Sequence, residues 1–292
     1  MSQQFTGAGV ALITPFNSNN QIDEKALETV VCNQVNGGMD YLVALGTTAE
    51  VSTLTTVEKS KIIEIVKKNA GNLPVVVGIG GNDTQKVIDN IKSTNLNGIS
   101  GLLVVTPYYN KPTQEGMFRH YMAIAGASEL PIILYNVPSR TGINLESETV
   151  VRLANASDKF VAVKEASGVM SQITTIAKHA PAGFTVISGD DVLALPTMAI
   201  GGKGVISVIA NALPEKISSL IHLAAEGKYN EATKIHFDLI DLLKYIFKEG
   251  NPGGVKALMN YMGLVENELR LPLYKVSDKT VEEIIDAYLK IK

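Results

Sequence analysis

Short, nearly continuous runs of apolar residues recur along the first 210 residues of the chain. Each run is four to seven residues long, is rich in valine and isoleucine, and is bounded by glycine, proline, asparagine or aspartate. Strands that are buried on both faces have this pattern, whereas half-exposed strands alternate apolar and polar residues. The pattern therefore predicts eight buried strands, at residues 9–14, 41–46, 74–80, 101–106, 131–137, 160–166, 185–189 and 204–210.

Amphipathic helical patterns separate these runs, for example at 23–34, 56–68, 84–93 and 172–178. Capping residues precede two of them, Thr55 or Thr56 with Glu58 behind it, and Asp83. Strands that alternate with helices pair in parallel through right-handed crossovers, and eight such units make a closed (β/α)₈ TIM barrel of the α/β class. An open doubly wound sheet often carries a GxGxxG motif after its first strand, and this chain has none there.

The tail of the chain, from Pro214 onward, contains helical patterns only, at roughly 214–226, 229–247 and 252–263, with a last one near 278–290. No linker rich in proline, glycine or serine separates it from the strands before it. We therefore predict two regions, a catalytic barrel over residues 1–212 and a helical extension over residues 213–292 that packs on the barrel.

The composition narrows the class of protein further. Of the 292 residues, 46% are hydrophobic, which is enough for a large core, and only 19% are charged. The net charge of −3 argues against a nucleic-acid or membrane-surface partner. Cys32 is the single cysteine, so we expect a buried structural thiol in a reducing compartment. Residues 1–10 lack the features of a signal peptide and no apolar run reaches membrane-spanning length, so we expect a cytoplasmic protein.

Lys164 is the clearest candidate for chemistry. It is the fifth residue of the apolar run that begins at Phe160, and active sites of TIM barrels lie at the carboxyl ends of the strands. Burial disfavours the charged form of an amine, and the neutral form attacks carbonyl groups. A structural ion pair with Glu165 or Glu50 is the alternative that the residues leave open.

Other polar residues follow the strands and could serve the same chemistry. The hydroxyls of Tyr135, Tyr109 and Thr47 are suited to passing protons, although tyrosines that pack on a barrel with exposed tips would have the same pattern. Arg140 lies in a loop shortly after Tyr135, where its guanidinium could bind a substrate carboxylate or lie in solvent.

Metal and phosphate chemistry have less support. The four histidines, at 120, 179, 222 and 236, lie in helical patterns without ligand spacing, so we expect no metal. Asp190 and Asp191 could bind Mg²⁺ with Glu50 or Glu165, but no further carboxylates cluster with them. Residues 201–204 resemble a phosphate loop, yet they precede a strand instead of a helix.

Taken together, these segments resemble the dihydrodipicolinate synthase / N-acetylneuraminate lyase family from about Gly7 to Leu273. The resemblance rests on GVALITPF (9–16), GTTAE (46–50), VTPYYNKPTQEG (105–116), PIILYNVPSRTG (131–142), VAVKEASG (161–168), SGDD (188–191) and GVISV (204–208). It implies a (β/α)₈ barrel with a C-terminal helical domain and a pyruvate Schiff base on Lys164, with no dissociable cofactor.

The resemblance also implies roles for the surrounding residues. Tyr135, Thr47 and Tyr109 would form a proton relay, with Tyr109 reaching the neighbouring subunit's site across a tight dimer, within what is commonly a tetramer. Thr48 and the backbone of Ile206 would hold the pyruvate. Arg140, with the tandem tyrosines, resembles the dihydrodipicolinate synthase branch and would bind the carboxylate of L-aspartate 4-semialdehyde.

The implied reaction is the condensation of pyruvate with that aldehyde to 4-hydroxy-tetrahydrodipicolinate, in lysine and diaminopimelate biosynthesis. Three alternatives stay open: another pyruvate aldolase of the same family, acting on N-acetylneuraminate or a 2-keto-3-deoxy acid; a non-catalytic metabolite-binding member; and a metal-dependent barrel enzyme.

Two departures from the family pattern matter. Ala49 replaces the glycine of GTTGE, which is tolerable if its φ is negative. The positions tied to feedback inhibition by lysine read Val51, Ser52, Thr56, Lys59 and Lys86. The ammonium of free lysine would meet the like charges of Lys59 and Lys86, so we predict weak or absent inhibition, although Asn82 and Tyr108 remain.

Overall fold

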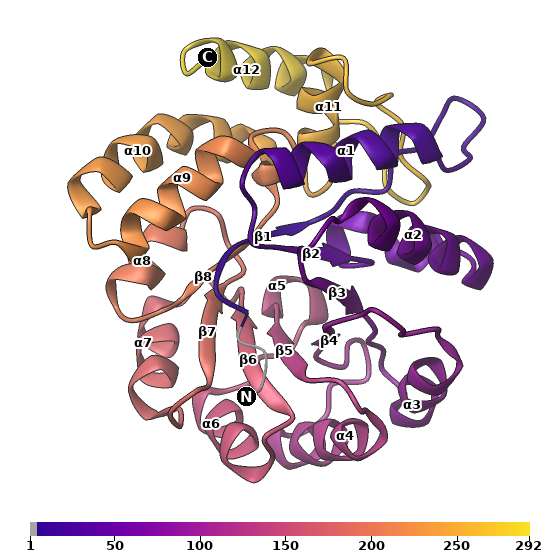
Figure 1. Cartoon of the computed structure of the whole chain (residues 1–292), viewed down its shortest axis with the longest axis vertical. Helices are drawn as coiled ribbons and strands as arrows, with labels where there is room; N and C mark the ends of the chain where they lie inside the picture. Colours follow the sequence, from indigo (N-terminus) through magenta and orange to yellow (C-terminus); the bar gives the residue numbers. More distant parts are fainter. Residues whose placement is uncertain (1–4) are drawn as a thin grey trace.

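Eight parallel strands close into a barrel in the computed structural model, which describes residues 5–292 (Figure 1). Residues 1–4, which begin the N-terminal segment considered above, lie outside the described part. The strands pair in chain order and β8 pairs with β1. They are β1 (Gly7–Ala11), β2 (Tyr41–Ala44), β3 (Val75–Gly78), β4 (Gly101–Val105), β5 (Ile132–Asn136), β6 (Phe160–Glu165), β7 (Thr185–Ser188) and β8 (Gly204–Ser207). The predicted TIM-barrel class is confirmed.

Helices surround the barrel and follow the strands along the chain (Figure 1). They are α1 (Glu24–Asn36), α2 (Thr56–Asn69), α3 (Thr84–Ser93), α4 (Gln114–Ala127), α5 (Pro138–Thr141), α6 (Ser147–Ala156), α7 (Met170–His179), α8 (Ala194–Ala199), α9 (Pro214–Ala225), α10 (Tyr229–Ile246), α11 (Gly253–Tyr261) and α12 (Asp278–Leu289), with 3₁₀ turns η1 (Thr47–Ala49), η2 (Val51–Thr53) and η3 (Ile209–Asn211). The eight helices predicted by range agree with these bounds to within two residues. Thr55 and Glu58 form the capping box of α2.

Strand β1 begins and ends earlier than its apolar run at 9–14. Beyond Ala11 the backbone leaves the sheet, because the N–H of Ile13 donates to Oδ1 of Asn211 at 3.0 Å and the hydroxyl of Thr14 donates to the carbonyl of Ala49 at 2.8 Å. The run continues because the residues after the strand are also buried, as Ile13 is. The length of this apolar run therefore reflects how many residues are buried, and not how many belong to the strand.

Strand β8 is likewise shorter than its run at 204–210, and the chain enters η3 instead. The cause is the buried carboxylate of Asp191, which accepts the N–H groups of Val208 and Ile209 at 3.0 and 3.2 Å. Burial raises the pKa of Asp191, although these hydrogen bonds oppose the rise. This carboxylate shapes the backbone after β8, and the suggested Mg²⁺ role has no support in its contacts.

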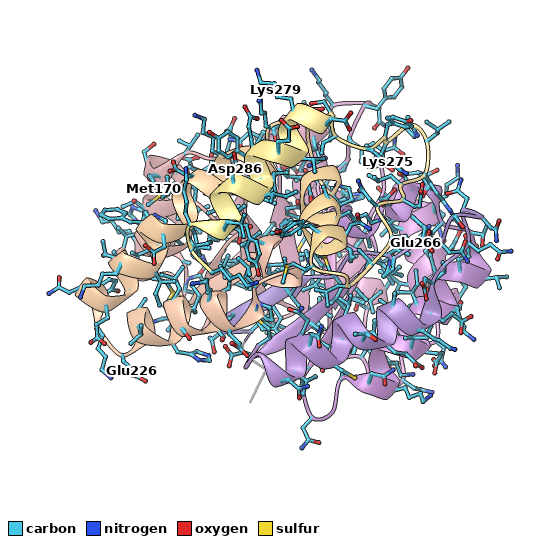
Figure 2. All side chains as sticks on the ribbon, turned by 90° about the horizontal axis from the view of Figure 1, so that it is seen from above. Met170, Glu226, Glu266, Lys275, Lys279 and Asp286 are labelled. Carbon is cyan, nitrogen blue, oxygen red and sulfur yellow. The ribbon has the colours of Figure 1, made fainter. Side chains whose placement is uncertain are left out.

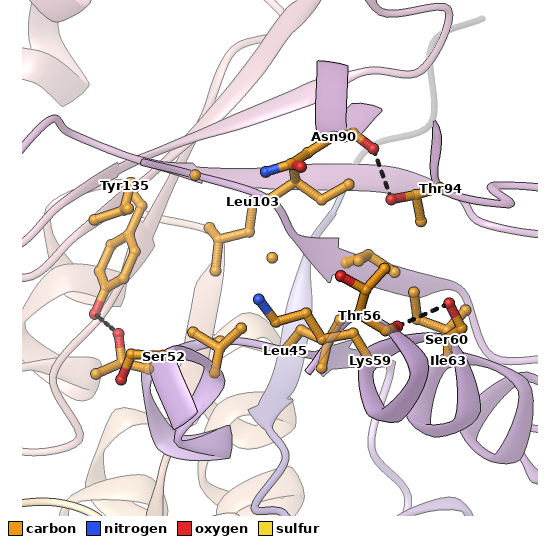
Figure 3. Close-up of a pocket in the computed structure, with 18 of the residues that line it drawn as sticks. Leu45, Ser52, Thr56, Lys59, Ser60, Ile63, Asn90, Thr94, Leu103 and Tyr135 are labelled. Carbon is orange, nitrogen blue, oxygen red and sulfur yellow. Dashed lines mark hydrogen bonds between the residues drawn. The ribbon is translucent and has the colours of Figure 1, made fainter. Parts of the chain in front are cut away.

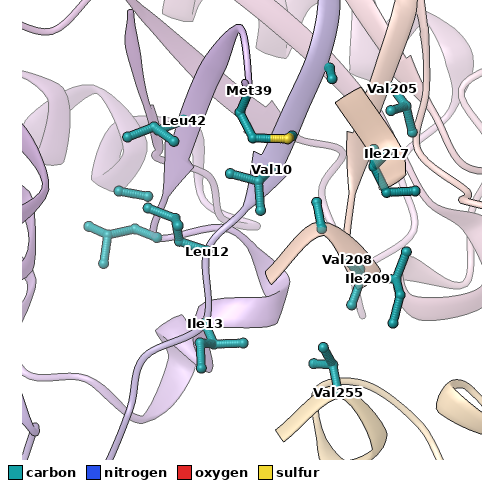
Figure 4. Close-up of a cluster of buried hydrophobic side chains, with 14 of the residues drawn as sticks. Val10, Leu12, Ile13, Met39, Leu42, Val205, Val208, Ile209, Ile217 and Val255 are labelled. Carbon is teal, nitrogen blue, oxygen red and sulfur yellow. The ribbon is translucent and has the colours of Figure 1, made fainter. Parts of the chain in front are cut away.

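Apolar side chains fill both the inside of the barrel and the layer between strands and helices. Val43, Ile133 and Ile187 belong to the inner cluster. Figure 4 shows part of the outer layer, where Val10 of β1 and Ile217 of α9 belong to one cluster of buried side chains. The barrel interior is therefore a packed core, and chemistry is restricted to its open end.

Helices α10 to α12 pack against one another, and Figure 2, seen from above, shows the last of them, α12, in yellow on the near side of the molecule. Their connection to the barrel is partly ionic: Nζ of Lys256 in α11 lies 2.5 Å from Oε1 of Glu50 with both side chains fully buried. Arg270 binds Glu58 of α2, with its Nη2 2.5 Å from Oε1. The ring of Phe16 lies 4.4 Å from both cations. The C-terminal residues therefore contact the loops that follow β1 and β2.

The pair between Arg270 and Glu58 predicts a pH-dependent contribution to stability. Hydrogen bonds from Arg270 are the main cause that lowers the pKa of Glu58 from 4.5 to about 2. A carboxyl whose pKa is lowered in the folded state stabilises the fold above its unfolded pKa, and that contribution is lost as the pH falls towards 2. We expect Glu58→Gln to lower the free energy of unfolding by about 1–2 kcal/mol at pH 7, after allowance for solvent screening.

Urea unfolding of both proteins between pH 7 and pH 3 measures this difference. The difference in the free energy of unfolding between the wild type and Glu58→Gln should stay constant down to pH 5 and become smaller below about pH 4.5. Glu24→Gln is the matched control, because the Glu24–Lys61 pair is half-exposed and should contribute less than about 0.5 kcal/mol. A difference in stability that does not depend on pH would contradict a contribution from the ionised Glu58 carboxylate.

Two expectations about single features are resolved by the described residues. Cys32 lies on the exposed side of α1, so the expectation of a buried thiol is wrong. Its neighbours in the helix, Val30 and Val31, are buried instead. No helix within residues 5–292 is both long and apolar enough to span a membrane.

Candidate active site

Lys164 lies at the open end of the barrel and points inward. It is the fifth residue of β6, in register with Tyr135 of β5 and Ile187 of β7, and it is only 4% exposed. Ala162, two residues earlier on the same face of the strand, belongs to the inner cluster. The predicted position of this lysine, buried at the end of a strand, is confirmed.

Neither carboxylate proposed as a structural partner of Lys164 pairs with it. Glu165 points to the other face of β6, where it accepts hydrogen bonds from Asn136 and Gln172. Glu50 pairs with Lys256. Within residues 5–292, Lys164 has no salt bridge. The ion-pair interpretation is therefore wrong, and the amine is buried without a counter-ion.

Gly189, directly after β7, leaves the space that the lysine side chain occupies. A Cβ atom at Gly189 would lie 3.1 Å from both Cγ and Cε of Lys164 and 2.7 Å from the Cβ of Ala166. Any larger residue would displace the lysine stem. Sequence reasoning did not single out this glycine, although it lies inside the SGDD segment.

The ring of Tyr135 lies beside the amine, and its hydroxyl meets the hydroxyl of Thr47. Nζ of Lys164 is 4.5 Å from the centroid of the Tyr135 ring, and the Tyr135 hydroxyl is 3.5 Å from Oγ1 of Thr47, at the limit of a hydrogen bond. Figure 3 shows Tyr135 with this contact drawn at one edge of a pocket. The structure thus brings together two of the three residues of the predicted proton relay, Tyr135 and Thr47.

Thr47 and Thr48 belong to the tight turn η1 at the end of β2. Thr48 is buried, and its Oγ1 accepts a hydrogen bond from Nδ2 of Asn251 at 3.0 Å. Ala49 is buried in the same turn and has a negative φ, whereas Glu50 takes the left-handed conformation at φ 55°. The methyl group of Ala49 is therefore compatible with the turn. Asn251 was missed by sequence reasoning, because it lies 203 residues beyond Thr48.

Arg140 and Ile206 occupy different surroundings. Arg140 is exposed on the short helix α5, beyond the end of β5. Ile206 is buried in β8 and belongs to the inner cluster. Both lie at or beyond the carboxyl ends of strands, as predicted, but neither forms a hydrogen bond or an ion pair with Lys164 in the part of the chain that the structure describes.

Tyr109 is separated from the other relay candidates. It is 91% exposed and has a φ of 71°, a conformation that side chains other than glycine rarely adopt. Within the described residues it has no hydrogen bond to Thr47 or Tyr135. The expectation that it belongs to the site of its own protomer receives no support, and the expectation of a role in a neighbouring subunit stays a prediction.

A cavity of about 280 Å³ is lined in part by Tyr135 and Thr47, and Lys164 is not among its lining residues. Tyr108 and Lys59 line it, and Figure 3 shows the amine of Lys59 directed into the pocket. Asn82 is not among its lining residues, and its carbonyl accepts a hydrogen bond from Asn110. Of the residues connected with lysine inhibition, the cavity thus gathers Val51, Ser52, Thr56, Lys59 and Tyr108.

The histidines offer no metal site in the described residues. His120, His179, His222 and His236 all lie in helices, as predicted. Burial lowers the pKa of His120 to about 4, and its Nδ1 lies 2.8 Å from the hydroxyl of Thr84. No group of three or more metal-ligating side chains converges anywhere in residues 5–292.

A parallel barrel with an unpaired lysine at its mouth, next to a tyrosine ring, can support nucleophilic chemistry on a carbonyl group. Comparison with known proteins gives the family. A model described as the dihydrodipicolinate synthetase family matches residues 4–291. The chain belongs to this family, which confirms the predicted resemblance.

Individual relatives match over nearly their whole length. The chain is 50% identical to 4-hydroxy-tetrahydrodipicolinate synthase of Parabacteroides distasonis, with 95% of this chain and 94% of that protein covered. The crystal structure of dihydrodipicolinate synthase from Aquifex aeolicus is 41% identical, with a TM-score of 0.94 and 98% of each chain covered. The chloride-inhibited enzyme from Acinetobacter baumannii, complexed with pyruvate, is 37% identical, with a TM-score of 0.95 and 98% of each chain covered.

Proposed function

We propose that this chain catalyses the condensation of pyruvate with L-aspartate 4-semialdehyde to 4-hydroxy-tetrahydrodipicolinate, in lysine and diaminopimelate biosynthesis. The observation that carries this proposal is the buried amine of Lys164, which has no counter-ion and lies 4.5 Å from the ring of Tyr135. Relatives that carry the name of this activity match nearly the whole chain at up to 50% identity. The enzyme is a lyase of the Schiff-base type.

The first half of the reaction forms the covalent intermediate. Neutral Lys164 attacks the ketone carbon of pyruvate to give a carbinolamine, and a proton supplied through Tyr135 lets its hydroxyl leave as water. Loss of a methyl proton from the resulting imine gives an enamine. Thr47 supports the proton transfers, because its hydroxyl lies next to that of Tyr135. The protonated imine between pyruvate and Lys164 accepts the electron pair that the methyl proton leaves behind, so the proposal includes no dissociable cofactor.

The second half joins the two substrates. The enamine carbon attacks the aldehyde carbon of L-aspartate 4-semialdehyde, and the amino group of this substrate then attacks the imine carbon. Ring closure expels the amine of Lys164 and gives 4-hydroxy-tetrahydrodipicolinate. Arg140 binds the carboxylate of the aldehyde substrate through its planar guanidinium, and Thr48 with the backbone of Ile206 holds the pyruvate end.

Reduction with borohydride in the presence of pyruvate tests the proposal. Intact-mass measurement and peptide mapping should find one reduced pyruvate adduct, located on Lys164. Activity with L-aspartate 4-semialdehyde should exceed activity with N-acetylneuraminate or 2-keto-3-deoxygluconate, which separates the proposal from the other pyruvate aldolases. Absence of the adduct would exclude the mechanism.

The contact between Tyr135 and Thr47 predicts a defect in proton transfer when the phenolic hydroxyl is removed. We expect Tyr135→Phe to lower kcat by about 100-fold or more, since positioned acid–base groups contribute that much. The reduced adduct should still form, but more slowly, because the amine remains. Rapid-quench measurement of adduct formation separates this result from loss of pyruvate binding. Tyr229→Phe, remote in α10, is the control and should be unaffected.

The exposure of Tyr109 supports an oligomer. A tyrosine that is 91% exposed, in a left-handed backbone conformation, carries both strain and apolar surface in the isolated protomer. We propose that it enters the site of the neighbouring subunit across a tight dimer, and that two such dimers form a tetramer. Sedimentation of the wild type and of Tyr109→Ala measures the assembly.

The division of the chain remains part of the proposal. A catalytic barrel over residues 1–212 and a helical region over residues 213–292 fit the end of β8 at Ser207 and the start of α9 at Pro214. Helix α9 packs against β1 as well as α10, so it joins the two regions. A cytoplasmic location fits the single cysteine, Cys32.

Lysine inhibition should be weak. Lys59 directs its amine into the cavity next to Tyr108, so the ammonium of free lysine would meet a like charge there (Figure 3). Lys86 lies outside this cavity, 3.8 Å from Asp83, and adds less to the repulsion than the sequence suggests. We expect no inhibition by L-lysine below about millimolar concentration in a steady-state assay, and stronger inhibition of Lys59→Glu. Sub-millimolar inhibition of the wild type would contradict the prediction.

A further inference from the structure

The turn that carries Thr47 and Thr48 is held at two points by the segment around α11. Asn251, just before α11, donates from Nδ2 to Oγ1 of Thr48 at 3.0 Å, and both residues are more than nine-tenths buried. At the end of the same turn, Lys256 binds Glu50. Residues more than 200 positions apart in the sequence therefore meet next to the candidate pyruvate site.

We propose that Asn251 is a positioning residue that turns the hydroxyl of Thr48 into a hydrogen-bond donor for the pyruvate carboxylate. This inference rests on the proposed function, because it takes Thr48 as a ligand of pyruvate. A threonine hydroxyl has one proton and two acceptor lone pairs. When one lone pair accepts from Asn251, the proton is free to point elsewhere. A carboxylate can only accept hydrogen bonds, so it needs this orientation of the hydroxyl.

A second observation supports a functional reason for the amide. Oδ1 of Asn251 is buried, and no hydrogen-bond donor among the described residues reaches it. Such a group costs stability compared with an apolar residue of similar size, and functional sites are where these groups are retained. The side chain of Asn251 is therefore held only by the hydrogen bond from its Nδ2 to Thr48. A purely structural role does not explain why an amide is present at this position.

Asn251→Asp replaces the hydrogen-bond donor of this contact with an acceptor and keeps the size of the side chain. An ionised aspartate has no donor, so the Thr48 hydroxyl would donate to it and lose its proton for the substrate. We expect the KM for pyruvate to rise about 10- to 100-fold, with kcat within about threefold, because a hydrogen bond to a charged group is lost. Asn251→Ala frees the hydroxyl to rotate and should raise the KM about three- to tenfold.

The double variant with Thr48→Val shows whether Asn251 acts through Thr48. Without the hydroxyl, Asn251→Asp should change the KM for pyruvate by less than about twofold, since the shared contact is already absent. In Thr48→Ser, which keeps the hydroxyl, the full effect should return. An undiminished effect in the Thr48→Val background would mean that the charge of the aspartate acts directly on pyruvate, and it would overturn the inference.

The controls separate this inference from the proposed function. Asn260→Asp changes an asparagine within α11, whose Nδ2 donates to the carbonyl of Val265 at 2.9 Å, and it should leave pyruvate kinetics unchanged. If the wild type forms the reduced adduct on Lys164 but both Asn251 variants keep the wild-type KM for pyruvate, the inference fails and the proposed function stands. If the wild type forms no adduct, the proposed function itself fails.

Discussion

Replacing Lys164 with alanine should abolish the reduced pyruvate adduct and lower kcat by at least roughly a thousandfold, because no other group can replace a covalent nucleophile. Lys164→Arg should have the same result, since a guanidinium is always charged and does not form an imine. The alanine variant should fold, because removing a buried amine that has no counter-ion relieves a desolvation cost. The cavity left by the buried stem opposes this gain, so alanine should change the free energy of unfolding by less than about 2 kcal/mol. The arginine variant buries a permanent charge, so it serves only as a test of the chemistry.

The two measurements together distinguish a catalytic lysine from a structural one. A structural lysine at this position would pair with a carboxylate, and its loss would lower stability by several kcal/mol. Lys178→Ala, in α7, is the control for the chemical labelling and should retain both adduct and activity. Persistence of the adduct in Lys164→Ala would place the Schiff base on another lysine and contradict the assignment.

The local pattern of apolar and polar residues was sufficient to predict the barrel and the residues that lie at the ends of its strands. Lys164 and Tyr135 are each the fifth residue of an apolar run, and a run buried on both faces has a strand as its simplest explanation. Parallel pairing in chain order then places all strand ends on one side. The direction of the two side chains follows from the alternation of residues along a strand, so their proximity could be predicted without long-range information.

Contacts between segments far apart in the chain could not be predicted from the local pattern of apolar and polar residues. Glu50 was considered as a partner for Lys164 because both follow strands, yet its partner is Lys256. A lysine within an amphipathic helix pattern is normally exposed, and nothing near Lys256 in the sequence marks it as fully buried. The same holds for Asn251, whose partner Thr48 lies near the other end of the chain. Strand ends were likewise misplaced where side chains such as Asp191 capture the backbone.

The buried pair of Lys256 and Glu50 should be the most sensitive point for stability. Both side chains have no exposed surface, and Glu50 also accepts the N–H of Arg270 at 3.0 Å. Burial lowers the pKa of Lys256, although the attraction of Glu50 opposes this effect. Lys256→Met removes the cation and leaves a buried carboxylate. We therefore expect the free energy of unfolding to fall by about 3–5 kcal/mol, as for other broken buried pairs.

Changing both partners should cost less than changing one. In the double variant Lys256→Met with Glu50→Gln, no charge is left unpaired, and the glutamine side chain can still accept the N–H of Arg270. Urea unfolding of the single and double variants measures the difference, with Lys275→Met as the control for a partly exposed pair, where less than about 1 kcal/mol is expected. If Lys256→Met cost no more than Lys275→Met, the buried pair would not be what holds α11 against the turn after β2. In that case the hydrogen bond between Asn251 and Thr48 would be the main connection between them.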